Sequence, residues 1–207
     1  MARVLSTAQL FAEAPEFAVL AIDVPIGLPD DGPRAVDIVA RRLLGAPRAS
    51  SVFPAPVRAA LNGVSYSDAS ALSFAACGKR LSRQAYAIIP KIREVDSAMR
   101  AAGDAASRVR EVHPEVCFYY LNNLSPMRYS KRKALGLSER LARLEGHFRP
   151  IFAELRASVD RRAASSNDIA DALVALWSAE RIRAGSCTVL RGEPLHDSRG
   201  LRMEMVA

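Results

Sequence analysis

A short apolar run that ends on an acidic residue is the feature that most constrains the fold of this chain. Residues 17–22 (FAVLAI) are too few and too continuously apolar for an amphipathic helix, and Asp23 follows them directly. Such a run is typical of a strand that is buried in a sheet. Ligand sites in α/β sheets favour strand ends, so Asp23 is a candidate site residue. The alternative is that its carboxylate caps the tight turn at residues 24–27.

Helical periodicity covers most of the remaining chain. We expect helices over residues 6–13, 31–45, 67–77, 82–103, 114–120, 138–145, 151–159 and 167–183, and strands over residues 108–113, 187–190 and 201–206. Residues 197–200 (DSRG) are predicted to form a turn. A few strands among many helices favour a layered α/β domain, and the absence of repeats and long linkers predicts one domain over residues 1–207.

Two further acidic residues lie near the start of the predicted helix 167–183. Asp168 and Asp171 are three residues apart, so they share one helix face. Asp168 has a second interpretation, because an acidic residue in a first helical turn complements the helix dipole or caps the helix. Asp171 has mostly apolar neighbours. A buried carboxylate needs a compensating positive charge. The clustering of carboxylates in a chain of net charge +7 therefore indicates that they bind Mg²⁺ or Mn²⁺, which prefer oxygen ligands.

A third set of acidic residues lies within the predicted strand-to-helix turn at residues 111–115 (EVHPE). Glu111 and His113 share one strand face by the two-residue period, and Glu115 falls in the first turn of the next helix. The helix dipole alone would account for Glu115. Catalytic and structural roles therefore both stay open for these residues.

The positive charges favour a polyanionic partner or, equally, a solvated basic face. Residues 127–133 (MRYSKRK) combine cations with a tyrosine and a serine, which suits phosphate contact and base stacking. The candidate nucleic-acid-binding residues are Arg48, Ser50, Lys91, Arg128, Lys131 and Lys133.

Several classes of protein are disfavoured. The chain has no GxxxxGK[ST], GxGxxG, GxSxG or HExxH motif. Its apolar runs are shorter than the ~18–20 residues of a membrane span, and its first residues lack the apolar core of a signal peptide. Three cysteines without a CxxC pair fit reduced thiols and argue against a zinc site. We therefore expect a cytoplasmic protein without a membrane partner.

Five motifs in order resemble one family, from about Phe17 to the C-terminus. They are residues 21–29 (AIDVPIGLP), 50–58 (SSVFPAPVR), 82–96 (SRQAYAIIPKIREVD), 111–115 (EVHPE) and 168–173 (DIADAL). The chain resembles the ribonuclease H-like nucleases known as domain of unknown function family 429. The resemblance implies a central mixed sheet flanked by helices, with a mostly helical insertion after the Asp23 strand.

The resemblance also implies a two-metal site. Asp23 would be the central-strand ligand, and Asp171 with Asp168 would supply the helix ligands. Two Mg²⁺ or Mn²⁺ ions held there would activate a water and stabilise the leaving oxygen of a phosphodiester. Members of the family usually begin with a β-hairpin that carries a glycine-flanked aspartate, whereas this chain runs from Met1 directly into the first predicted helix. We expect that lack of this acid weakens two-metal catalysis, and that a second copy of the chain covers the exposed sheet edge.

Three functions remain open on the sequence. The first is a metal-dependent nuclease, which needs Asp23, Asp168 and Asp171 to converge. The second is a non-catalytic nucleic-acid-binding or scaffold protein of the same fold, with salt-sensitive binding. The third is an enzyme that acts on a small phosphorylated substrate, for which a closed pocket would be evidence.

Overall fold

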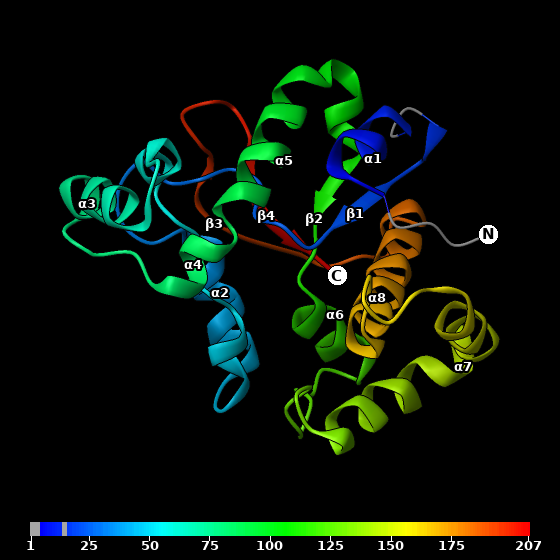
Figure 1. Cartoon of the computed structure of the whole chain (residues 1–207). Helices are drawn as coiled ribbons and strands as arrows, with labels where there is room; N and C mark the ends of the chain where they lie inside the picture. The colour runs from blue at the N-terminus through cyan, green and yellow to red at the C-terminus, as the bar shows by residue number, and fades with distance from the viewer. Residues whose placement is uncertain (1–4, 14–15) are drawn as a thin grey trace.

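The computed structural model describes residues 5–13 and 16–207 and shows a mixed α/β fold in which helices predominate (Figure 1). In chain order, with η for a 3-10 helix, the elements are α1 (Thr7–Glu13), β1 (Leu20–Ile22), α2 (Ala35–Leu44), η2 (Arg48–Ser51), η3 (Arg58–Asn62), α3 (Tyr66–Cys77), α4 (Arg83–Ala87), α5 (Ile89–Ala101), η4 (Gly103–Arg108), β2 (Val109–Glu111), α6 (Pro114–Leu121), α7 (Ala134–Ser158), α8 (Ser166–Arg183), β3 (Val189–His196) and β4 (Arg202–Val206). The predicted α/β class is confirmed. The prediction about an N-terminal hairpin concerns residues 1–4, which lie outside the described residues.

The strands form two small sheets within the described part of the chain. β1 and β2 form a parallel pair, with Leu20 opposite Val109, and β3 and β4 form an antiparallel pair. The family resemblance implies one central mixed sheet, but the parallel and antiparallel pairs are separate. β1 and β2 have only three residues each. An ion pair between Arg110 and Glu204 (2.7 Å), rather than a ladder of hydrogen bonds, connects β2 to β4.

The segment between β1 and β2 is mostly helical, as predicted. The helix expected from Ser82 onwards begins there, since the Ser82 hydroxyl accepts a hydrogen bond from the Ala85 amide (3.0 Å). It is interrupted at Ile88, between α4 and α5. The cause is Pro90, which has no N–H to donate to the carbonyl group of Tyr86.

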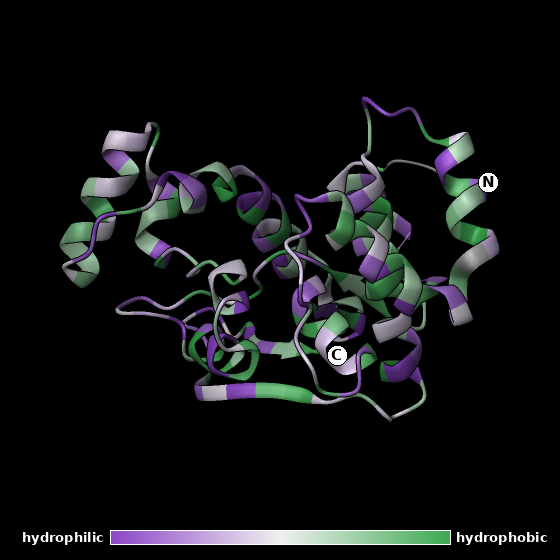
Figure 2. Cartoon of the chain, turned by 90° about the horizontal axis from the view of Figure 1, so that it is seen from below, coloured by the Kyte–Doolittle hydropathy of each residue, from purple (hydrophilic) through white to green (hydrophobic). Residues whose placement is uncertain are grey.

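The helices of the C-terminal half build the main core. α7 joins the two helices predicted at residues 138–145 and 151–159, with a kink at Phe148 just before Pro150. α8 packs against both α7 and β1, which brings the helix of Asp171 beside the strand that precedes Asp23. Hydrophobic and hydrophilic residues alternate along the helices (Figure 2). The fully buried residues of this core, to which α2 also contributes, include Val36, Ala40, Phe118, Leu144, Ala170 and Val174.

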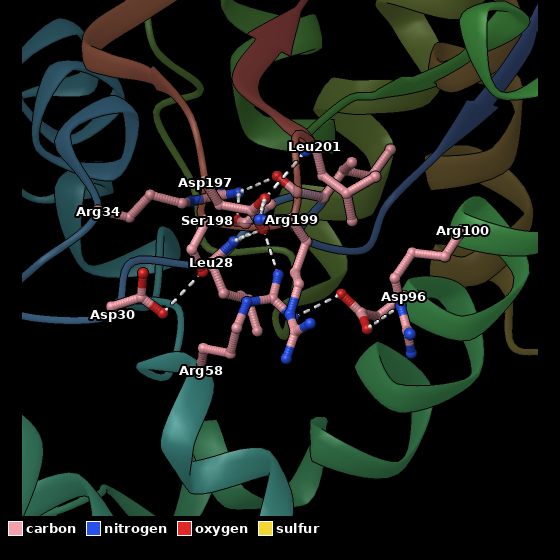
Figure 3. Close-up of polar contacts among 12 residues, drawn as sticks. Leu28, Asp30, Arg34, Arg58, Asp96, Arg100, Asp197, Ser198, Arg199 and Leu201 are labelled. Atoms are coloured by element: carbon pink, nitrogen blue, oxygen red, sulfur yellow. Dashed lines mark hydrogen bonds and ion pairs between the residues drawn. The ribbon is translucent and has the colours of Figure 1, made fainter.

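The turn between β3 and β4 is fixed by a buried carboxylate (Figure 3). The Asp197 side chain accepts hydrogen bonds from two amides of its own turn (2.9 Å each), from the amide of Leu28 (3.0 Å) and from the guanidinium group of Arg58. Arg58 also contacts Asp96 (2.9 Å) on α5. The cluster therefore connects the predicted turn to three segments that are distant in sequence, at Leu28, Arg58 and Asp96.

The Asp197 cluster makes the stability of the fold sensitive to acid. Burial alone would raise the pKa of Asp197, but the hydrogen bonds from the Leu28 amide, the turn amides and Arg58 lower it below its ordinary value. The folded-state pKa thus lies below the unfolded one. Ionised Asp197 stabilises the fold above pH ~4, and this contribution is lost as the pH falls through the folded-state value.

We predict that Asp197→Asn lowers the free energy of unfolding by about 1–3 kcal/mol at pH 7 and by less at pH 3, which lies below the unfolded-state pKa. Urea unfolding at both pH values measures the difference. Asp30→Asn is the matched control, because the Asp30 carboxylate is exposed and accepts a hydrogen bond at the surface from Ser198 (3.0 Å). An equal loss for Asp197→Asn at both pH values would contradict the prediction.

Candidate functional site

A cavity of about 680 Å³ lies beside the carboxyl ends of the two parallel strands, and we call it the strand-end cavity. Asp23 follows β1 directly and His113 follows β2 by two residues, and both line it. Its remaining lining comes from the loop after β1, from η2 and the residues that follow it, from Gln84 on α4 and Ile88 just after it, from residues 111–115 and 130–132, and from Met205 on β4. The residues with polar side chains are Asp23, Arg34, Arg48, Ser50, Ser51, Gln84, Glu111, His113, Glu115, Ser130, Lys131 and Arg132.

Asp23 lines this cavity and is electrostatically coupled to Asp171, which does not line the cavity but contacts the lining residue Lys131. The Asp23 side chain is accessible to solvent, but the protein that surrounds it removes part of its water. This desolvation, together with the negative charge of Asp171, raises the pKa of Asp23 to about 7, and Lys131 partly offsets the effect. Of the three predicted metal ligands, Asp23 and Asp171 are therefore the two that the fold brings within each other's electrostatic influence.

Lys131 supplies the positive charge that these carboxylates need. Its ammonium group contacts the Asp171 carboxylate at 2.7 Å. Burial alone would lower the pKa of Lys131, but Asp171, Asp23 and Glu115 raise it, so the lysine stays protonated. The sequence predicts Lys131 as a nucleic-acid contact, and the structure gives it a second role beside the acids.

The loop that carries Lys131 is held in place from three sides. The Glu139 carboxylate accepts hydrogen bonds from the amides of Arg128 (2.8 Å) and Tyr129 (3.0 Å). The Asn167 side chain donates to the carbonyl group of Lys131 (3.0 Å). A Cβ atom on Gly136 would lie 2.0 Å from the carbonyl oxygen of Ser130, so only glycine allows this close approach. The backbone of this loop is thus held in place before any ligand binds.

Glu111, Glu115 and His113 line the strand-end cavity but have structural partners. Glu111 is buried and pairs with Arg34 (2.5 Å), and buried Glu115 pairs with Arg140. The His113 ring contacts the carbonyl oxygen of Ser51 (3.3 Å), and burial lowers the pKa of this histidine. These contacts favour the structural role that the sequence leaves open for each of them.

Asp168 has a structural role too. Its carboxylate accepts a hydrogen bond from the Ser165 amide (2.7 Å), and the Ser165 hydroxyl accepts one from the Asp168 amide (3.3 Å). This is the capping box of α8, which agrees with the second interpretation of the sequence. Asp168 is exposed and does not line the strand-end cavity. Within residues 5–13 and 16–207, no three His, Cys, Asp or Glu side chains form a group that could hold a metal ion.

The predicted nucleic-acid-binding residues divide into two groups. Arg48, Ser50 and Lys131 line the strand-end cavity, whereas Lys91, Arg128 and Lys133 do not. Lys91 instead contacts Glu94 and the Thr7 hydroxyl group of α1, both at 3.0 Å.

Some residues that line the strand-end cavity were not predicted as site residues, although they lie in motifs described in the sequence analysis. Arg132 belongs to the basic segment 127–133, and Ser51, Phe53 and Gln84 belong to motifs of the family resemblance. These motifs are the sequence signal that could have identified the residues. Only the fold shows that they meet at one cavity.

These features define a mixed α/β protein with a charged cavity at the ends of two parallel strands. The chain belongs to the family described as "Protein of unknown function (DUF429)", which it matches over residues 2–196. No curated protein and no solved structure matches it. The predicted membership in family 429 is thereby confirmed. Among the described residues, no helix has both the length and the apolar character needed to cross a membrane.

Proposed function

We propose that this protein is a ribonuclease H-like hydrolase that cleaves phosphodiester bonds of nucleic acid in the strand-end cavity, with Mg²⁺ or Mn²⁺ as cofactor. The observation that carries the proposal is the electrostatic coupling of Asp23, which lines the cavity together with the cations Arg48 and Arg132, to Asp171 on α8. Carboxylates beside guanidinium groups are the combination that phosphodiester hydrolysis needs.

The donor set of this pair fits a hard divalent ion. Asp23 and Asp171 repel each other, and both offer carboxylate oxygens. Mg²⁺ is commonly bound by one or two carboxylates and completed by waters and substrate phosphate, so a third protein ligand is not required. Asp23 and Asp171 would hold the ion, and Asp168 would not. When bound, the ion would polarise the phosphate and activate a water molecule.

The other charged residues of the cavity have separate tasks in this proposal. Arg48 and Arg132 bind the phosphate backbone, because neither guanidinium group has a carboxylate partner among the described residues. Lys131 holds Asp171 in position through their 2.7 Å contact and neutralises its charge. Because hydrogen bonds hold the backbone of the Lys131 loop, the loop itself needs no reordering when substrate binds.

The Lys131 contact also favours a second candidate. An ammonium group that already neutralises Asp171 provides the compensating charge that a metal would otherwise supply. The protein would then bind nucleic acid at the same cations without cleaving it.

Metal-dependent cleavage distinguishes the two candidates. We predict that the protein cleaves members of a panel of labelled single- and double-stranded DNA and RNA with Mn²⁺ or Mg²⁺, and that excess chelator stops the cleavage.

Arg132→Ala should raise KM about tenfold or more, since a hydrogen bond to a charged group is worth about 1.5–3 kcal/mol. Lys133→Ala, which changes the neighbouring exposed cation outside the cavity, should leave KM unchanged. Salt-sensitive binding without cleavage by the folded protein would overturn the proposal in favour of the second candidate.

A further inference from the structure

Phe53 is an exposed aromatic ring on a loop that is fixed on both sides. Its side chain is 42% exposed and lines the strand-end cavity. The carbonyl oxygen of Val52 accepts a hydrogen bond from Arg41 (2.7 Å), and the amide of Ala55 donates one to Asp37 (2.7 Å). The loop is therefore anchored to α2, yet the ring is left in contact with water. A rigidly presented apolar ring beside a cavity indicates a stacking platform for a ligand.

The same cavity offers groups that suit the rest of a nucleotide. Val24, Ile88 and the exposed Gln84 line it together with Phe53, so apolar side chains and an amide are available to one ligand. Bases are recognised by stacking between apolar side chains and by hydrogen bonds to their edges. The guanidinium groups of Arg48 and Arg132 provide the anion-binding part.

The size of the cavity limits how much of a nucleic acid can enter. About 680 Å³ is within the range of ~300–1,000 Å³ that is usual for small-molecule sites. We propose that the strand-end cavity receives one unpaired nucleotide, with its base stacked on Phe53 and its phosphate bound by Arg48 and Arg132. This inference rests on the proposed function and specifies its substrate as a strand end, a single strand or an extruded nucleotide rather than paired duplex.

Binding of adenosine 5′-monophosphate to the full chain, measured by calorimetry beside ribose 5-phosphate and inorganic phosphate, tests the inference. The nucleotide should bind more tightly than either base-free phosphate. Phe53→Ala should weaken nucleotide binding about tenfold or more and leave phosphate binding unchanged, and Phe53→Tyr should retain it. Phe74→Ala is the matched control, because Phe74 on α3 is 52% exposed and does not line the cavity. A short single-stranded oligonucleotide should displace the nucleotide, and a blunt duplex should do so far less.

The outcomes separate this inference from the proposed function. Equal affinity for the nucleotide and for inorganic phosphate, or an unchanged nucleotide affinity in Phe53→Ala, would overturn the inference while metal-dependent cleavage could still stand. Nucleotide binding that depends on Phe53, in a protein that cleaves no strand, would support the inference and overturn hydrolysis.

Discussion

Replacing Asp23 with asparagine is expected to lower the rate of metal-dependent cleavage at least about 1,000-fold while the protein stays folded. A bound divalent ion contributes several kcal/mol to transition-state stabilisation, and each ~1.4 kcal/mol corresponds to a tenfold change in rate. Asparagine removes the charge that would hold the ion. It also removes the repulsion between Asp23 and Asp171 that contributes to the raised pKa of Asp23, so the free energy of unfolding should not fall. Loss of activity without loss of stability is the expected signature of a functional carboxylate.

Asp171→Asn should give the same loss of cleavage, and Asp168→Asn provides the matched control on the same helix. Asp168 belongs to the capping box of α8, so its replacement should cost about 0.5–1 kcal/mol of stability and leave the cleavage rate within a few-fold of the parent. Rates come from single-turnover cleavage at saturating Mn²⁺, and stability comes from urea unfolding. If Asp168→Asn abolished cleavage and Asp23→Asn did not, the assignment of the two-carboxylate pair would be wrong.

Local patterns predict much of the fold. The capping serine, the apolar spacing and the following glycine are all local signals, and they place the helix at residues 167–183 within one residue of α8 (Ser166–Arg183). The short strand before Asp23 is also found, although only Leu20–Ile22 pairs with β2. Separation into two sheets is not visible in the sequence, because it depends on which strands meet after folding.

The partners of the site residues could not be predicted in the same way. Asp171 is found because its apolar neighbours make a simple surface role improbable, but its contact with Lys131 joins residues that are 40 positions apart. For Asp168 the sequence supports both a ligand and a cap, and only the hydrogen bonds of the capping box favour one of them. Glu115 likewise has its partner 25 residues away, in Arg140.

Arg34 is the position at which a single substitution should destabilise the fold most. Its guanidinium group is almost completely buried and donates to two carboxylates, Glu111 (2.5 and 2.8 Å) and Asp37 (2.7 and 2.9 Å). Burial alone would lower the pKa of Arg34, but the two carboxylates raise it above its ordinary value, so the group stays charged. We expect Arg34→Met to lower the free energy of unfolding by about 3–5 kcal/mol, because it leaves two buried acids without their partner. Arg34→Lys should recover little, since an ammonium group cannot reproduce a planar fork between two carboxylates.

Urea unfolding of Arg34→Met beside Arg42→Met, an exposed arginine of α2, measures this effect, and the control should change by less than about 0.5 kcal/mol. Adding Glu111→Gln to Arg34→Met should restore part of the stability, because it removes one of the uncompensated charges. Full stability of Arg34→Lys would contradict the argument.

Glu111 also accepts a hydrogen bond from the Ile26 amide (2.7 Å), and Arg34 donates to the carbonyl group of Ile26 (3.1 Å). The ion pair therefore fixes the loop that follows Asp23, so conservative variants that keep the fold but loosen this pair should lower cleavage through the position of Asp23.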